Sequence, residues 1–404
     1  MPIAEFPVEI FDIIIDQVHY AHVPSQKVYA TVQLPVVQTN STLATCALVC
    51  RHWLRHSRAL QFKSVDLTPR PLDFYDTEFL TSFLELLRSQ VATITPHIQH
   101  IKLYFADPGP QFRSDLALLS SFVAIGTMSL ELNPEREYMG DTVKEIVPFL
   151  RSLSNLKKLE LISWKYETLE QLQSIVYACH RLEDLDIVGG LHLQPVLETL
   201  STSDSTPTPP SLPTSLRALK ASSFSSEKYL LPWLVSCAPS TSITNLDLNL
   251  QTFLTHKSRP SCGRLLQALA SSLEHLTIEH RGRLLVVNEN LFEDINLQVN
   301  DRLKTITFTE SPPKIISAII NQISSPNMKM IDFSVPLLEK YWQDIAHFGA
   351  IDLMLHRPVF SHLYAINIDQ RGVAGELSAD TSWIQKMLPR SVARDIVKHD
   401  LILI

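Results

Sequence analysis

Residues 156–161 read Leu156-Lys157-Lys158-Leu159-Glu160-Leu161, with apolar side chains at the first, fourth and sixth positions. In an extended chain the last two leucines point to one face, and the charged side chains of Lys158 and Glu160 point to the other. The same spacing returns at 182–187 and 243–248. A stretch this short buries its apolar face only against a neighbouring copy. The pattern therefore predicts a stacked array of repeats.

The repeat continues through most of the 404 residues, with about eleven copies in all. Successive starts from position 156 lie 25 to 35 residues apart. The copies are Phe62-Val65-Leu67, Ile98-Ile101-Leu103, a weak one around Leu130-Leu132, Leu156-Leu159-Leu161, Leu182-Leu185-Ile187, a weak one at Leu216-Leu219-Ala221, Ile243-Leu246-Leu248, Leu273-Leu276-Ile278, Leu303-Ile306-Phe308, Met328-Ile331-Phe333 and Leu363-Ile366-Ile368. Helices are predicted between the strands, for example at 78–91, 167–179, 314–323 and 337–348.

These copies resemble leucine-rich repeats, and the resemblance implies an α/β fold, a solenoid with a curved parallel sheet. The chain departs from the repeat consensus eight residues after the first apolar position, where Asn or Cys is usual. Trp164, Gly190, Gln251, Arg281 and Ser311 stand there instead. The repeat is therefore irregular. An ordinary α/β domain with a parallel sheet is the alternative interpretation.

The first sixty residues contain two apolar stretches at helical spacing. Phe6 and Pro7 open the first, where a first-turn proline costs no hydrogen bond. Ile10 and Ile14 continue it, and residues 43–53 form the second. A module of about 60 residues buries too little of this surface internally. Part of the apolar stripe is therefore expected to face a partner.

This N-terminal stretch resembles an F-box, the module that docks a substrate receptor onto a cullin-type ubiquitin ligase through a Skp-family adaptor. The matching positions are Phe6, Pro7, Glu9, Ile10, Ile14, Val18, Leu43, Val49, Cys50, Trp53 and Phe62. The resemblance implies adaptor contacts by Phe6, Pro7, Ile10, Ile14, Leu48, Val49 and Trp53. Phe6 replaces the usual Leu, and an insert at 19–41 lengthens the connection between the helices. A purely structural cap on the repeats is the alternative.

The expected organisation is an F-box-like helical domain at 1–60, an irregular leucine-rich-repeat solenoid at 61–375 and a C-terminal cap at 376–404. Residues 201–214 (STSDSTPTPPSLPT) are expected to form a disordered loop between repeats. Residues 376–404 have lost the repeat pattern, and Trp383, Ile384, Met387, Ile396 and residues 401–404 are expected to cover its last apolar edge.

Composition excludes several classes of protein. The net charge of −7 without a basic run argues against nucleic acid as a partner. The longest uncharged stretch, 28–50, is too polar to span a membrane. Five cysteines without a framework spacing favour a reducing compartment, so a cytoplasmic or nuclear location is expected. Cys46, Cys50, His52 and His56 would lie on opposite sides of one helix, so no metal site is expected there. No nucleotide-binding or metalloprotease motif occurs, and no cofactor is expected.

The remaining chemistry is that of surface recognition. Positions between the buried leucines should line one face of the sheet, and four acidic side chains fall on them, namely Asp184, Asp186, Asp247 and Glu279. They predict a site for a basic segment of an unknown target protein. With the F-box resemblance, the chain is interpreted as a substrate receptor of a ubiquitin ligase, without catalytic activity of its own. A repeat scaffold with no ubiquitin role is the alternative, and an enzyme with an unmarked site is a third.

Overall fold

A computed structural model defines the fold in two compact units. The first comprises residues 1–133, 144–159 and 404, and the second comprises residues 134–143 and 160–403. The structure describes residues 13, 15–16, 42–49, 51–68, 78–89, 94–105, 112–132, 140–164, 168–188, 212–222, 230–238, 242–249, 259–279, 295–336, 345–372 and 382–403.

The first described residues of this unit, 13, 15–16 and 42–46, are helical, and an alternation of helices and strands follows. Its elements are α3 (Arg51–Gln61), β1 (Ser64–Leu67), α4 (Glu78–Arg88), the 3₁₀ helix η1 (Thr95–His97), β2 (His100–Phe105), α5 (Phe112–Leu119) and β3 (Thr127–Leu132). The chain passes between the two units within α6 (Gly140–Ser152) and β4 (Lys158–Ile162).

The second unit repeats the same alternation of strand and helix. Its strands are β5 (Asp184–Val188), β6 (Ala218–Ser222), β7 (Asn245–Asn249), β8 (His275–Glu279), β9 (Thr305–Thr309), β10 (Met330–Pro336), β11 (Ala365–Gly372) and β12 (Val397–Leu403). Its helices are α7 (Leu169–Ala178), α8 (Leu230–Cys237), α10 (Arg259–Ala268), α11 (Pro313–Gln322), α13 (Ile345–Met354), η4 (Pro358–Phe360), α14 (Ser382–Met387) and α15 (Pro389–Ala393).

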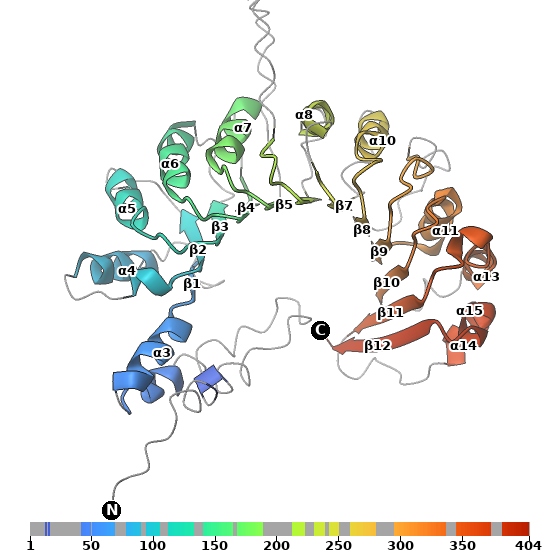
Figure 1. Ribbon diagram of the computed structural model, residues 1–404, viewed down its shortest axis with the longest axis horizontal. Helices are drawn as coiled ribbons and strands as arrows, with labels where there is room; N and C mark the ends of the chain where they lie inside the picture. The colour runs from blue at the N-terminus through green and yellow to red at the C-terminus, as the bar shows by residue number, and fades with distance from the viewer. Residues whose placement is uncertain are drawn as a thin grey trace, which may run out of the picture. The chain divides into compact units, whose positions relative to one another are not determined.

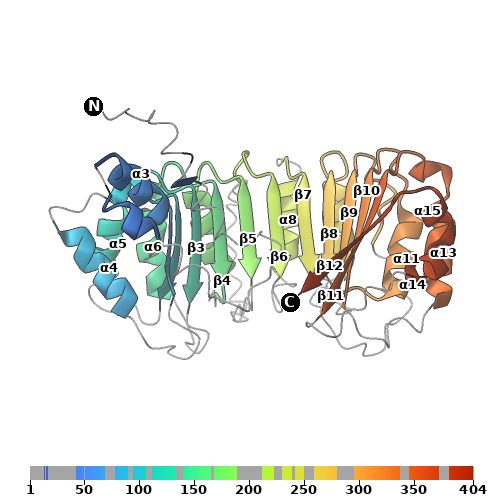
Figure 2. The ribbon, with the colours of Figure 1, turned by 90° about the horizontal axis from the view of Figure 1, so that it is seen from below.

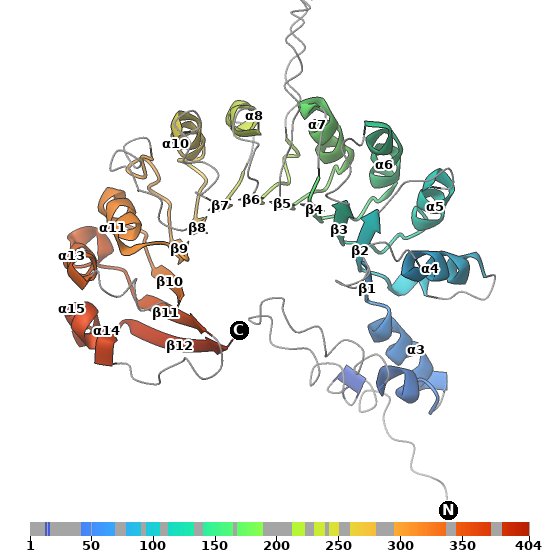
Figure 3. The same cartoon turned by 180° about the vertical axis from the view of Figure 1, so that it is seen from behind.

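Within each unit neighbouring strands pair in parallel and follow the order of the chain, β1-β2-β3 in the first and β5 to β12 in the second. In the second unit the helices α7, α8, α10, α11 and α13 lie along one face of the sheet (Figure 1). Figure 2 shows its strands in front of the helices, and Figure 3 shows the same layers from behind. The face away from the helices is called the open face below.

The core of the second unit is built from rows of apolar side chains that continue from strand to strand in register. Leu185, Leu219, Leu246 and Leu276 form one such row, and all four are buried. Helix α11 packs against the same layer with Ile315, Ile316, Ile319 and Ile320, at the three- and four-residue steps that place side chains on one helix face. Each repeat therefore buries its apolar edge against the next, as the sequence predicts.

The backbone also ties the repeats together at the entry to each strand. The carbonyl of the residue just before a strand accepts two hydrogen bonds, from two consecutive amides of the following repeat. In the second unit the carbonyl of Glu183 accepts from Arg217 and Ala218, and that of Arg217 accepts from Thr244 and Asn245. The carbonyls of Thr244, Glu274 and Lys304 repeat this pattern, as do those of Lys63, Gln99 and Gly126 in the first unit. We call these groups the entry carbonyls.

The predicted strands are confirmed at every copy of the apolar pattern, and the weak copy near Leu130 is a full repeat that starts earlier, at Ile125-Met128-Leu130. Strand β12 was not predicted. It pairs with β11 although the C-terminal stretch has no repeat pattern, and it adds a strand to the segment expected to act only as a cap. Ile384, Met387 and Ile396 of that segment are buried, as expected.

Some expectations shift in detail or fall outside the described residues. The helix predicted at 337–348 is described only from Ile345 and runs on to Met354. Ser311, at a consensus Asn position, is buried, and its hydroxyl donates to the carbonyl of Ile278 at 3.4 Å, so it does bridge neighbouring repeats. Gly190, Gln251 and Arg281, the 19–41 insert and residues 201–211 lie outside the described residues.

Candidate interaction surfaces

The N-terminal helical residues combine a small core with exposed apolar side chains. Ile15 and Leu43 are buried, whereas Leu48 is 85% exposed, Val49 61% and Ile13 59%. Exposed apolar side chains of this kind are the material from which a contact with a partner protein is built. Leu48 and Val49 were predicted as adaptor contacts. Ile13 was not, although it lies three residues after Ile10, and this helical spacing could have indicated it.

Of the other predicted adaptor contacts, the structure describes Trp53. Trp53 lies in α3 and is partly exposed. Phe6, Pro7, Ile10 and Ile14 lie outside the described residues.

One polar contact joins Asp16 to His56 of α3. The Nε2 atom of His56, in α3, lies 3.0 Å from a carboxylate oxygen of Asp16. The two residues are 40 positions apart in the sequence, so the contact closes the chain around the insert at 19–41. This contact places Asp16 against α3.

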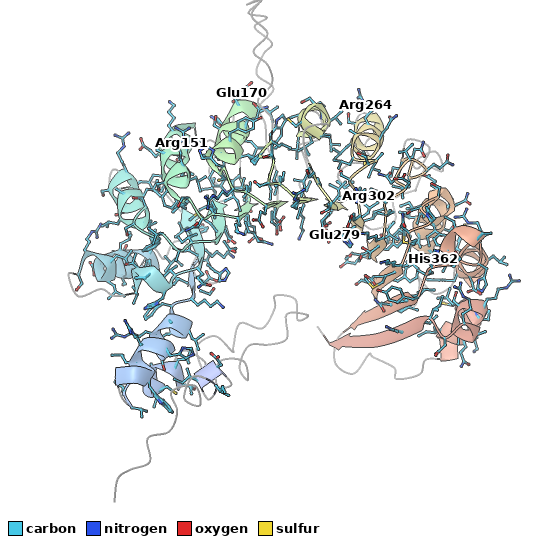
Figure 4. All side chains as sticks on the ribbon, in the orientation of Figure 1. Arg151, Glu170, Arg264, Glu279, Arg302 and His362 are labelled. Carbon is cyan, nitrogen blue, oxygen red and sulfur yellow. The ribbon has the colours of Figure 1, made fainter. Side chains whose placement is uncertain are left out.

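The four acidic residues predicted as a target site do lie on the open face of the second unit. They come from three of the four neighbouring strands β5 to β8, and Lys220 on β6 lies among them. In the strand register Asp186 pairs with Lys220, Lys220 with Asp247, and Asn249 with Glu279. In Figure 4, Glu279 lies on the open side, whereas Glu170 and Arg264 lie on the helical layer.

The four carboxylates differ in how far solvent reaches them. Asp186 and Glu279 are buried, each with 7% of its surface exposed, whereas Asp184 and Asp247 are partly exposed. The amide of Asn249, itself buried, lies 3.3 Å from a carboxylate oxygen of Glu279 and donates to it. The sequence could place these residues on one face but could not distinguish the buried pair from the exposed pair.

Lys220 is the basic group in the middle of this acidic face. Its Nζ lies 3.6 Å from a carboxylate oxygen of Asp186. Burial by itself lowers the pKa of Lys220, but the charges of Asp186, Asp247 and Glu279 outweigh that effect, and the pKa lies above its ordinary value. Lys220 therefore remains a cation at neutral pH and offsets part of the acidic charge.

From β8 to β11 the polar side chains of the open face hydrogen-bond to one another. The ring of His275 lies 2.7 Å from the hydroxyl of Thr305. On the next strands the carboxylate of Asp332 accepts from Thr307 at 3.1 Å and from Asn367 at 2.6 Å. Asp332 is thus engaged with its neighbours, and the acidic character of the face concentrates on β5 to β8.

A shallow hollow of about 420 Å³ lies between α5 and α6 in the first unit. Leu116, Pro148 and Phe149 line its floor, and the guanidinium of Arg113 crosses it to the carboxylate of Glu145, with two contacts of 2.6 and 2.5 Å. The charged groups of Arg113 and Glu145, which both line the hollow, are therefore paired with each other.

Over the residues that the structure describes, no group of three or more His, Cys, Asp or Glu side chains is placed to hold a metal ion. Cys179 and Cys262 are buried, and burial raises the pKa of each thiol to about 12, so neither is a ready nucleophile. Among the same residues no helix is long and apolar enough to cross a membrane.

Strands in parallel register, a helix after most of them and rows of buried apolar residues together define an α/β fold of leucine-rich-repeat type. Comparison with known proteins adds little to this description. No family model matches the chain, and no curated protein matches it significantly. Among solved structures, the chain is similar to the leucine-rich repeat-containing protein LegL7 from Legionella pneumophila, with a TM-score of 0.44 and 11% sequence identity. The match covers 80% of this chain and 97% of that one.

Proposed function

We propose that this chain is the substrate-recognition subunit of an SCF-type (Skp–cullin–F-box) ubiquitin ligase. In this proposal the N-terminal helical residues bind a Skp-family adaptor and, through it, a cullin. The open face of the second unit binds a protein target. The chain performs no catalytic step itself, and it works in the cytoplasm or the nucleus.

The observation that carries the proposal is the exposed apolar surface of the N-terminal helical residues. Leu48, Val49 and Ile13 face solvent beside the buried Ile15 and Leu43. Exposed apolar side chains of this kind fit the apolar centre of a protein interface, where a few large side chains supply most of the affinity. Phe6, Pro7, Ile10, Ile14 and Trp53 are proposed to complete this surface.

The test is capture of a purified Skp-family adaptor by the full chain. Leu48→Glu should weaken adaptor binding by about tenfold or more, because it places a charge in an apolar interface. Val123→Glu is the matched control, since Val123 is an exposed valine of the same unit, 69% exposed. Unchanged adaptor affinity in a folded Leu48→Glu variant, or no capture by the wild type, would contradict the proposal.

The proposed target site is the acidic part of the open face, formed by Asp184, Asp186, Asp247 and Glu279. Complementary charge would steer a basic segment of a target protein to this face, more strongly at low than at high salt. Proteins captured by the chain, and lost when Asp184 and Asp247 are both changed to Lys, would be candidate targets.

The alternative is a protein-interaction scaffold with no role in ubiquitin transfer. The open face, with its polar and hydrogen-bonding side chains, is suited to protein recognition whatever the N-terminal residues bind. The adaptor experiment separates the two functions, because a scaffold of this kind would capture protein partners without the adaptor.

A further inference from the structure

The acidic part of the open face has a cation at its centre. Asp186, Lys220 and Asp247 are register partners on three consecutive strands, β5, β6 and β7. The ammonium group of Lys220 lies 3.6 Å from Asp186, and 41% of the Lys220 side chain is exposed. Lys220 thus has a strand that carries a carboxylate on each side of it.

The carboxylates that are partly exposed to solvent lie on the outer two strands of this trio. Asp186 is buried beside Lys220, whereas Asp184 on β5 and Asp247 on β7 are partly exposed. Adjacent strands lie about 4.8 Å apart, so β5 and β7 are roughly 10 Å apart. In the register Asp184 aligns with Asn245, two residues before Asp247, which adds roughly 7 Å along the strands. The two carboxylates are thus about 12 Å apart, on either side of Lys220.

We infer that Lys220 determines which charge pattern this face accepts. The inference rests on the proposed target site and names the chemistry of its ligand. The ligand is an extended segment with two basic side chains about four positions apart and no basic side chain midway between them. In an extended chain, positions i and i+4 lie on one face and about 13 Å apart, which matches the spacing of Asp184 and Asp247. Lys220 is level with Asp247 on the strand between the two carboxylates, so the midway side chain falls within about 3 Å, one residue along β6, of the Lys220 position. At that distance a second cation is repelled and an acidic group is attracted.

The net charge of these five side chains, −4 from the carboxylates and +1 from Lys220, remains negative, so a basic segment is still attracted as a whole. Lys220 changes the selection among basic segments. Without it, a continuous run of positive charge would be the best ligand. With it, an interrupted pair is preferred relative to the run.

The experiment compares two fluorescent peptides that differ only at the central position, Arg-Ser-Glu-Ser-Arg and Arg-Ser-Arg-Ser-Arg, each flanked by Gly-Ser. Their affinities for the full chain are measured by anisotropy at low salt, with wild type and Lys220→Gln. Removing the cation should shift the ratio of the two affinities by about three- to fivefold toward the central Arg peptide. Lys220→Arg should keep the wild-type ratio, and it covers the case in which Lys220→Gln is unstable.

The matched control is Lys102→Gln, which removes an open-face lysine of the first unit whose Nζ lies 3.1 Å from Glu131. It should leave the ratio unchanged. A ratio that is equal in wild type and folded Lys220→Gln overturns the role of Lys220, while the target site stands if Asp247→Lys still weakens both peptides. If neither peptide binds, or if Asp184→Lys and Asp247→Lys have no effect, the proposed target site fails together with this inference.

Discussion

At the scale of single residues, a buried carboxylate organises the C-terminal end of the second unit. One oxygen of Asp352, in α13, accepts from the amide of Arg390 at 2.9 Å. The other accepts from the amide and the hydroxyl of Ser391, at 3.0 and 2.6 Å. These donors belong to the first turn of α15, so a side chain from another helix performs the capping that Leu388, before the helix, cannot.

Asp352→Ala should destabilise the protein by about 2–4 kcal/mol, since it leaves two amides and a hydroxyl without their acceptor in a buried place. Ser391→Ala, which removes one of the three bonds, should cost only about 1 kcal/mol. Urea unfolding of the full chain measures both. Equal effects of the two substitutions would argue against the capping role.

The ion pair of Glu274 should make the stability of the fold depend on pH. A hydrogen bond from Lys304 (2.6 Å) and the nearby charges of Lys304 and Arg302 hold the pKa of Glu274 below its ordinary value of 4.5. A carboxylate with a lowered pKa stabilises the fold above about pH 4.5 and loses this contribution as the pH falls through its folded value. Wild type should therefore melt at a slightly higher temperature than Glu274→Gln at pH 7.

The difference between the same two proteins should shrink as the pH falls through the lowered pKa of Glu274, because the carboxyl group then becomes protonated in the folded as well as the unfolded chain. Lys304→Met should reduce the pH-dependent difference, because Lys304 is its principal cause. A difference between wild type and Glu274→Gln that does not change with pH would exclude the ion pair as its origin.

At the scale of elements, the exits of two strands take the same unusual backbone conformation. Ser163, after β4, and Glu310, after β9, have positive φ angles of 58° and 53°. Their amides donate to the carbonyls of Val188 and Ser334 on the following strands. The turn that ends a repeat is thus held by the next strand even where a residue other than glycine occupies it.

Glu310→Gly should raise stability by up to about 1 kcal/mol, because glycine adopts a positive φ without the steric cost that a Cβ imposes. Glu310→Val should lower stability, since a β-branched side chain tolerates this region poorly. Thermal unfolding of the three proteins should rank them Gly, Glu, Val. Any other order would show that side-chain contacts of Glu310 outweigh its backbone strain.

The elements themselves were predictable where the core spacing is strict. Leu182, Leu185 and Ile187 are buried, and their pattern places β5 correctly. Strand β12 escaped prediction because its register puts Arg394 and His399 where other repeats carry apolar residues. The guanidinium of Arg394 instead approaches the carbonyls of Leu355 and Leu363, at 3.3 and 3.5 Å. A hydrogen bond from a side chain to a distant backbone carbonyl leaves no apolar periodicity in the sequence, so β12 could not be predicted from such a pattern.

The candidate site was predictable to the same degree. Alternation along the strands sufficed to bring Asp184, Asp186 and Asp247 to one face. The burial of Asp186 and the central place of Lys220 depend on which strands are neighbours and in what register. Strand neighbours and register are set by pairing between segments about 30 residues apart in the sequence. A single local pattern does not contain this information.

At the scale of the whole molecule, the two proposed surfaces belong to different compact units. We therefore expect their substitutions to act independently. Leu48→Glu should weaken adaptor capture and leave peptide binding to the open face unchanged, whereas Asp247→Lys should weaken peptide binding and leave adaptor capture unchanged. The double variant should show both losses at their single-variant size. A loss of adaptor capture in Asp247→Lys would reveal coupling between the two units.

The entry carbonyls have a consequence for how such a chain can evolve. They join one repeat to the next through main-chain atoms that every residue type supplies, so this joint survives almost any substitution other than proline at the donating positions. The side chains of the open face do not take part in these main-chain hydrogen bonds, so they can change without disturbing the joint between repeats. A lineage can therefore rewrite its charge pattern one codon at a time, acquiring and discarding partners, while inheriting the same framework unchanged.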